Sequence, residues 1–167
     1  MMTPAIKALI IANAAVFALQ TFFGGGLTGR IGPLTEYFSF VPNLAIYGLQ
    51  LWRFVTYMFL HAGLFQNGFN MFALWMFGSQ LALAWGARRF LRFYLLCGIG
   101  AGLIISTWPY VAVALGMADP ISLIYSTVGA SGAVYGVLLA YSLTWPDRTI
   151  MLIFPPVAFR AIWLIPL

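Results

Sequence analysis

Four long apolar runs constrain this chain more than any other feature of its sequence. They cover about residues 5–24, 64–85, 92–116 and 128–145. Each is close to the roughly 20 apolar residues that a helix needs to cross a bilayer, and lipid offers no hydrogen-bond partners to an open sheet. Only 7% of the 167 residues are charged, against about 25% in a typical soluble domain. The sequence therefore predicts an all-α, polytopic transmembrane helix bundle that forms a single membrane domain over residues 1–167.

Basic residues predict the orientation of these spans. Lys7, Arg88, Arg89, Arg92 and Arg148 fall on one side if the four spans alternate. Short loops that carry Lys and Arg stay on the cytoplasmic side, so we expect a multi-pass protein of the inner or plasma membrane with a cytoplasmic N-terminus. The net charge of +5 rests on few charged residues, so it indicates the lipid bilayer as a partner and not nucleic acid.

Two segments depart from simple spans. The connection over about residues 25–63 is long, aromatic and interrupted by glycine and proline, which disfavours a continuous helix. We expect a structured loop that is half-inserted in the membrane. Another apolar segment follows Arg148, and Leu167 comes seven residues after Arg160. This pattern predicts the start of a fifth span, with the remaining C-terminal spans lying beyond Leu167.

A serine flanked by glycines is the first candidate for chemistry. Ser131 lies in the run Gly129-Ala130-Ser131-Gly132, where the last full span begins. Free N–H groups and the positive dipole end of a helix starting there would suit a developing oxyanion. Tyr135 follows one turn later on the same face. The alternative is a packing serine in a seam formed by Gly132 and Gly136.

Polar side chains before and within the second apolar run are the second candidate. His61 is the single histidine, and Gln66 and Asn70 share a helix face by their i, i+4 spacing. Polar groups in a membrane helix are costly and face the bundle interior, so these residues serve either function or interhelical hydrogen bonding. One histidine and one cysteine, Cys97, cannot build a zinc site. We expect no metal and no cofactor.

Taken together, these motifs resemble the rhomboid family over almost the whole chain. The matching strings are Trp52-Arg53, Phe59-Leu60-His61, Asn70-Met71 and Gly129-Ala130-Ser131-Gly132, in the family's order and spacing. The resemblance implies a six-helix intramembrane serine protease that cleaves membrane-anchored protein substrates at or just below the membrane surface.

The resemblance also implies roles for individual residues. Ser131 matches the nucleophile, while His61 and Asn70 match positions that stabilise the oxyanion. The supporting residues that it implies are Gly129, Gly132 and Tyr135 around the serine, and Trp52 and Arg53 in the first loop.

Three departures from the family pattern bear on activity. The family's general base is a histidine on a sixth span, and this chain carries no histidine besides His61. Since a serine hydroxyl needs a base to take its proton, we expect the 167-residue chain to be inactive by itself. Gln66 stands where many members carry a second histidine. Ala82 lies near the position where many members carry a glutamate that braces the first loop and the second span.

Other classes of protein fit less well. A catalytically inactive rhomboid-like protein that binds membrane clients is the main alternative, and a channel or transporter is weaker because no intramembrane charges mark a pathway. The sequence contains no His-Glu-x-x-His motif, and Asp119 and Asp147 belong to opposite faces. Intramembrane metalloproteases and aspartyl proteases are therefore excluded.

Overall fold

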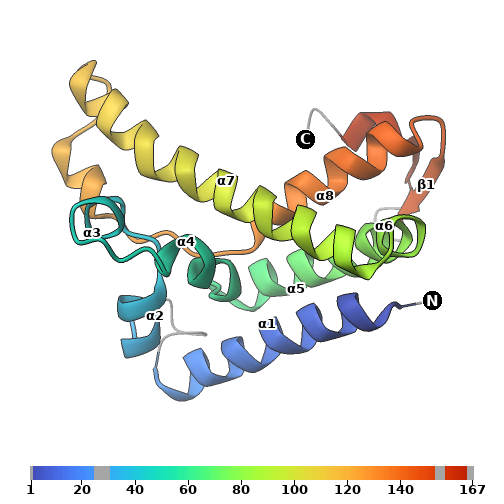
Figure 1. Ribbon diagram of the computed structural model, residues 1–167, viewed down its shortest axis with the longest axis horizontal. Helices are drawn as coiled ribbons and strands as arrows, with labels where there is room; N and C mark the ends of the chain where they lie inside the picture. The colour runs from blue at the N-terminus through green and yellow to red at the C-terminus, as the bar shows by residue number, and fades with distance from the viewer. Residues whose placement is uncertain (1, 25–30, 153–156, 165–167) are drawn as a thin grey trace.

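The computed structural model describes residues 2–24, 31–152 and 157–164 as a bundle of helices with one short hairpin (Figure 1). The elements in chain order are α1 (Pro4–Phe22), α2 (Pro33–Phe38), α3 (Pro42–Ile46), α4 (Arg53–Thr56), η1 (Tyr57–Phe59), α5 (Leu64–Ala73), η2 (Leu74–Gly78), α6 (Ser79–Trp85), α7 (Ala87–Ala114), η3 (Pro120–Ile124), α8 (Ser131–Thr144), β1 (Thr149–Leu152), β2 (Val157–Arg160) and η4 (Ala161–Leu164).

The four apolar runs fold mostly as helices, so the chain is helical as predicted, while four membrane crossings stay a prediction. Among the described residues, α1 and α7 are each long and apolar enough to cross a membrane, with 19 and 28 residues. α5, the π-helical segment η2 and α6 follow one another without a break over residues 64–85. α8 is a shorter apolar helix of 14 residues. α1 starts where its sequence indicates, because Thr3 caps the amide of Ile6 and Pro4 occupies the first turn.

The connection between α1 and α5 is structured, as predicted, over its described residues 31–63. α2, α3, α4 and η1 are short because Pro33 and Pro42 start new helices and a turn separates α3 from α4. An isolated antiparallel bridge joins Phe40 to Thr127, with N···O distances of 2.9 and 2.8 Å. The loop is therefore tied to the segment that leads into α8. Its half-insertion in a membrane stays a prediction.

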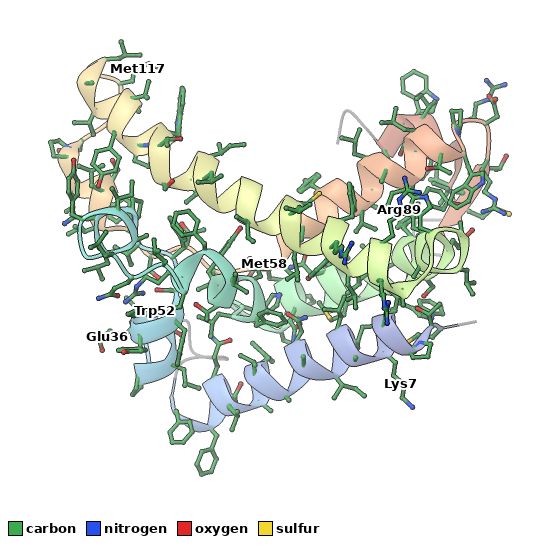
Figure 2. The ribbon with its side chains drawn as sticks, in the orientation of Figure 1. Lys7, Glu36, Trp52, Met58, Arg89 and Met117 are labelled. Atoms are coloured by element: carbon green, nitrogen blue, oxygen red, sulfur yellow. The ribbon has the colours of Figure 1, made fainter. Side chains whose placement is uncertain are left out.

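α7 packs against α8, α3, α4 and α6. Small residues allow the close approach, since Gly132 and Gly136 of α8 lie directly on Ala101 and Cys97 of α7. Met58, fully buried in the middle of the bundle (Figure 2), packs against α7 at Gly98. The two glycines of α8 therefore form the packing seam, which begins at Gly132, one position after Ser131.

The C-terminal part contains a short hairpin. β1 and β2 form an antiparallel hairpin that pairs Thr149 with Arg160, and η4 follows as a short 3₁₀ helix. Pro155 and Pro156, which lie outside the described residues, cannot donate a helical hydrogen bond, so they disfavour a continuous apolar helix through this region. The predicted start of a fifth span falls on the seven residues after Arg160, of which the structure describes 161–164 as η4, and it stays a prediction.

Basic side chains gather at one end of the bundle. Figure 2 shows Lys7 and Arg89 at the same end and Glu36 at the opposite end. Arg148 also belongs to the basic end, where its guanidinium donates to the side chain of Gln80 in α6. The grouping that alternating spans predict is therefore present in the fold.

Candidate active site

Ser131 is the first residue of α8, which confirms that a helix begins at the glycine-flanked serine. The helix starts behind Ala130 without a side-chain cap, and Ser131 itself is half-buried. The amides of the first helical turn have no partner within their own helix. The hydroxyl of Ser131 thus lies beside free N–H groups and the positive end of the helix dipole.

Gly129 shapes the approach to Ser131. Its φ is +131°, a backbone conformation that side chains with a Cβ rarely adopt. A Cβ at this position would also stand 2.7 Å from Nε2 of Gln66 and 3.6 Å from Oγ of Ser131. The amide of Gly129 donates to the carbonyl of Tyr57 over 2.9 Å. Glycine is therefore needed here for both conformation and space, and both Gln66 and the serine hydroxyl lie beside its Cα.

Gln66 connects the start of α5 to the chain before Ser131. Its Oε1 accepts a hydrogen bond from the amide of Ala62 over 2.7 Å, and its Nε2 donates to the carbonyl of Val128 over 3.2 Å. The structure thus brings Gln66 into the site more directly than the sequence indicates. Its i, i+4 relation to Asn70 was the available signal, but only the fold shows which segment the amide meets.

His61 is buried and held by its backbone. Gln20 of α1 accepts from the His61 amide over 2.9 Å and donates to its carbonyl over 3.3 Å. The side chain is 1% exposed, and neither ring nitrogen has a hydrogen-bond partner among the described residues. Burial lowers the pKa of His61 to about 4, against a smaller opposing effect of the Phe59 carbonyl. At neutral pH the ring is therefore uncharged, a possible hydrogen-bond donor but a weak base.

Asn70 lies one turn beyond Gln66 on the same face of α5. It is 7% exposed, and within the described part of the chain its Nδ2 has no hydrogen-bond partner. A buried amide donor without a partner costs free energy. Asn70 therefore carries an unused donor, although the described hydrogen bonds do not join it to Ser131.

Trp52 and Arg53 hold the loop together. Arg53 is buried, and its guanidinium donates to the carbonyls of Glu36 and Ser39 and to the side chain of Gln50. Trp52 stacks on Tyr37 with ring centroids 5.6 Å apart. These contacts are architectural, as the family resemblance implies for both residues.

Two other predicted positions differ in their setting. Tyr135 lies one turn after Ser131 on α8 and is 55% exposed. Ala82 is buried in α6, about 27 Å along the helix axis from Leu64 at 1.5 Å per residue. The loop packs near the start of that helix and α6 lies at its far end (Figure 1). The effect of position 82 on the bracing of the loop stays a prediction.

The fold and the site together define a class of protein: a helical bundle with spanning-length apolar helices and a glycine-flanked serine at a helix N-terminus. Residues 48–167 match the Rhomboid domain family, and the chain belongs to that family. Its members are integral membrane proteins and include serine proteases.

Characterised relatives agree with this assignment. The chain is 32% identical to the Rhomboid protease AarA of Providencia stuartii over 134 residues, which cover 79% of this chain and 47% of the relative. It is 34% identical over 137 residues to Rhomboid protein 1, mitochondrial, of Saccharomyces cerevisiae, covering 69% of this chain and 38% of the relative. The Presenilin-associated rhomboid-like protein, mitochondrial, of Mus musculus is 36% identical over 153 residues, covering 91% and 36%. The chain thus spans less than half the length of each of these relatives.

Proposed function

We propose that this chain carries the nucleophile of an intramembrane serine endopeptidase that cleaves membrane-anchored protein substrates. The observation that supports this most is the position of Ser131, at the uncapped start of α8 behind the positive φ of Gly129. In the proposed reaction Oγ of Ser131 attacks the carbonyl carbon of a substrate peptide bond, the C–N bond breaks, and the amine leaves with the proton that the serine gave up. Water then hydrolyses the acyl-enzyme, which releases the carboxylate product and restores the serine hydroxyl.

Three donors suit the oxyanion that this attack creates. The amide of Ser131 belongs to the first turn of α8, and Nε2 of Gln66 lies against Gly129. Asn70 supplies a buried Nδ2 that has no other partner among the described residues. Donors placed where charge develops stabilise the transition state. His61 is a further candidate, because a neutral imidazole donates one N–H. Gln66 is supported by its hydrogen bond to Val128, three residues before Ser131.

The general base is the missing part of this mechanism. Burial makes His61 a weak proton acceptor, and the carboxylates of Glu36, Asp119 and Asp147 are exposed in or beside loops. We therefore propose that the 167-residue chain alone hydrolyses substrate too slowly to detect, since loss of a catalytic dyad member costs on the order of 10⁶ in kcat. A histidine placed near Ser131 by additional protein sequence would restore the reaction.

Residues 4–22, 64–85, 87–114 and 131–144 are proposed to be four membrane crossings with a cytoplasmic N-terminus. The basic end of the bundle supports this orientation. Single cysteines in place of Tyr47 and Arg88, in a Cys97→Ala background, should react with an impermeant thiol reagent from outside and from the cytoplasm, respectively. Labelling of position 88 from outside would contradict the orientation.

Ser131→Ala tests the proposed chemistry in full-length protein purified in detergent. The variant should lose both cleavage of a fluorescent transmembrane substrate and labelling by a fluorophosphonate, while Ser126→Ala, which alters an exposed serine five residues earlier, should retain both. Unchanged turnover by Ser131→Ala would exclude the nucleophile assignment. If neither wild type nor variant reacts, and wild type instead retains membrane clients, the inactive client-binding alternative is correct.

A further inference from the structure

The turn between α6 and α7 forms a basic hollow at one end of the bundle. Gly86 makes this turn alone, with φ +81°. The hollow has a volume of about 540 Å³. Its lining consists of Trp85, Gly86, Ala87, Arg88, Arg89 and Arg92.

The three arginines of this hollow are close together and exposed. Arg88 and Arg92 are four residues apart on α7, and Arg89 lies between them, so all three are neighbours on the helix surface. The guanidinium of Arg89 sits over the ring of Trp85, 5.4 Å from its centroid, which restricts where this charge can move. Among the described residues, none of these three arginines forms an ion pair, and the ion pair at this end joins Arg160 to Asp147 at 3.5 Å.

Charges of one sign at this place repel each other. They also oppose the positive end of the α7 dipole, although the C-terminus of α6 offsets part of that effect. α7 begins without a side-chain cap, so main-chain N–H groups remain unpaired beside the arginines. An anion in the hollow would relieve the repulsion and accept hydrogen bonds from arginine in the forked geometry that suits phosphate.

The surrounding charges favour a ligand of the membrane surface. Six basic residues and one acidic residue lie at this end of the bundle, where Figure 2 labels Lys7 and Arg89. The others are Arg88 and Arg92 in the hollow, Arg148 beside Gln80 of α6, and the ion pair of Arg160 with Asp147. This end therefore holds a formal charge of +5, equal to that of the whole chain. Trp145, which stacks under Arg148 at 5.2 Å, adds a second interfacial aromatic residue beside Trp85.

We propose that the hollow at the α6–α7 turn binds the phosphate group of an anionic phospholipid. The hollow opens at the start of α7, a helix of spanning length, so it lies at the depth where lipid phosphates meet the hydrocarbon. Arg88, Arg89 and Arg92 hold the phosphate, and Trp85 contacts the start of the acyl chains. This site is separate from Ser131, which is the first residue of α8 and does not line the hollow.

Binding of single lipids to the purified full-length protein in a neutral detergent tests the proposal. Phosphatidylglycerol is titrated into the protein and bound lipid is counted by native mass spectrometry, with phosphatidylcholine as the zwitterionic comparison. Since each basic residue near an anionic lipid contributes roughly a factor of five, the triple variant R88Q/R89Q/R92Q should bind phosphatidylglycerol about a hundredfold more weakly. Far-UV circular dichroism checks that the variant is folded.

A matched variant separates this site from general attraction of charges. K7Q/R148Q/R160Q also removes three positive charges from this end, but none of these residues lines the hollow. It should therefore weaken binding by less than about fivefold, roughly the contribution of one residue beside the lipid. Equal losses in the two variants, or no loss in R88Q/R89Q/R92Q, would overturn the proposal. Displacement of the lipid by inorganic phosphate, at an ionic strength where sodium chloride has no effect, would assign the site to a free anion and overturn the lipid ligand.

Discussion

Acidification should destabilise the folded protein through His61. The ring is buried without a hydrogen-bond partner among the described residues, and burial lowers its pKa from 6.5 to about 4. Below pH 6.5 the unfolded chain binds a proton that the folded chain rejects, so the free energy of unfolding falls as pH falls. From about pH 7.5 to about pH 4.5 this difference amounts to about 2.5 kcal/mol, at roughly 1.36 kcal/mol per pKa unit.

The measurement is unfolding of detergent-solubilised protein by sodium dodecyl sulfate, followed by far-UV circular dichroism at a series of pH values. His61→Gln removes this titration and leaves every other ionisable group in place. The difference between the two pH profiles therefore isolates the histidine. Wild type should lose about 2.5 kcal/mol more than the variant between the two ends of the range. Parallel profiles would show that His61 takes up its proton in the folded state without cost, and the reasoning from burial would then be wrong.

Three further substitutions test the site and the packing. In an active full-length protein, Asn70→Ala should lower kcat by about 10²–10³ while fluorophosphonate labelling of the nucleophile persists, because only an oxyanion donor is lost; a wild-type rate would refute this role. Arg53→Met should reduce stability by about 3 kcal/mol, since it leaves buried carbonyls unpaired, whereas the exposed Arg88→Met should change little. Gly136→Val should cost about 1–3 kcal/mol through overpacking of the α7–α8 seam. Gly100→Ala, with nothing within 4 Å of the added Cβ, should not destabilise, and equal losses would contradict the packing account.

The sequence predicts the helices well because their signal is local. Apolar length alone places α1, the helix over residues 64–85, α7 and α8 within a few residues of where they lie, α7 starting five residues earlier than expected. The serine at the start of α8 is predicted by its flanking glycines, whose conformational freedom and small size are properties of single residues.

The contacts around the serine are less predictable, because they join distant parts of the chain. Gln66 reaches Val128, 62 positions away, and no periodicity within α5 specifies that partner. The pairing of β1 with β2 was missed because short apolar segments fit a helix or a strand equally well.

The position of Tyr57 has a consequence for the biosynthesis of this protein. Its hydroxyl donates to the carbonyl of Gly98 over 2.7 Å, and its own carbonyl accepts from Gly129 over 2.9 Å. Contacts between residues so far apart in sequence form late, since the intervening loop must close first. While the ribosome is still adding residues up to Gly129, the serine has not been synthesised and Tyr57 has at most one of its two partners. Ser131 therefore acquires these surroundings only after the whole segment from Tyr57 to Gly129 has been synthesised, and the shorter nascent chain holds no assembled site.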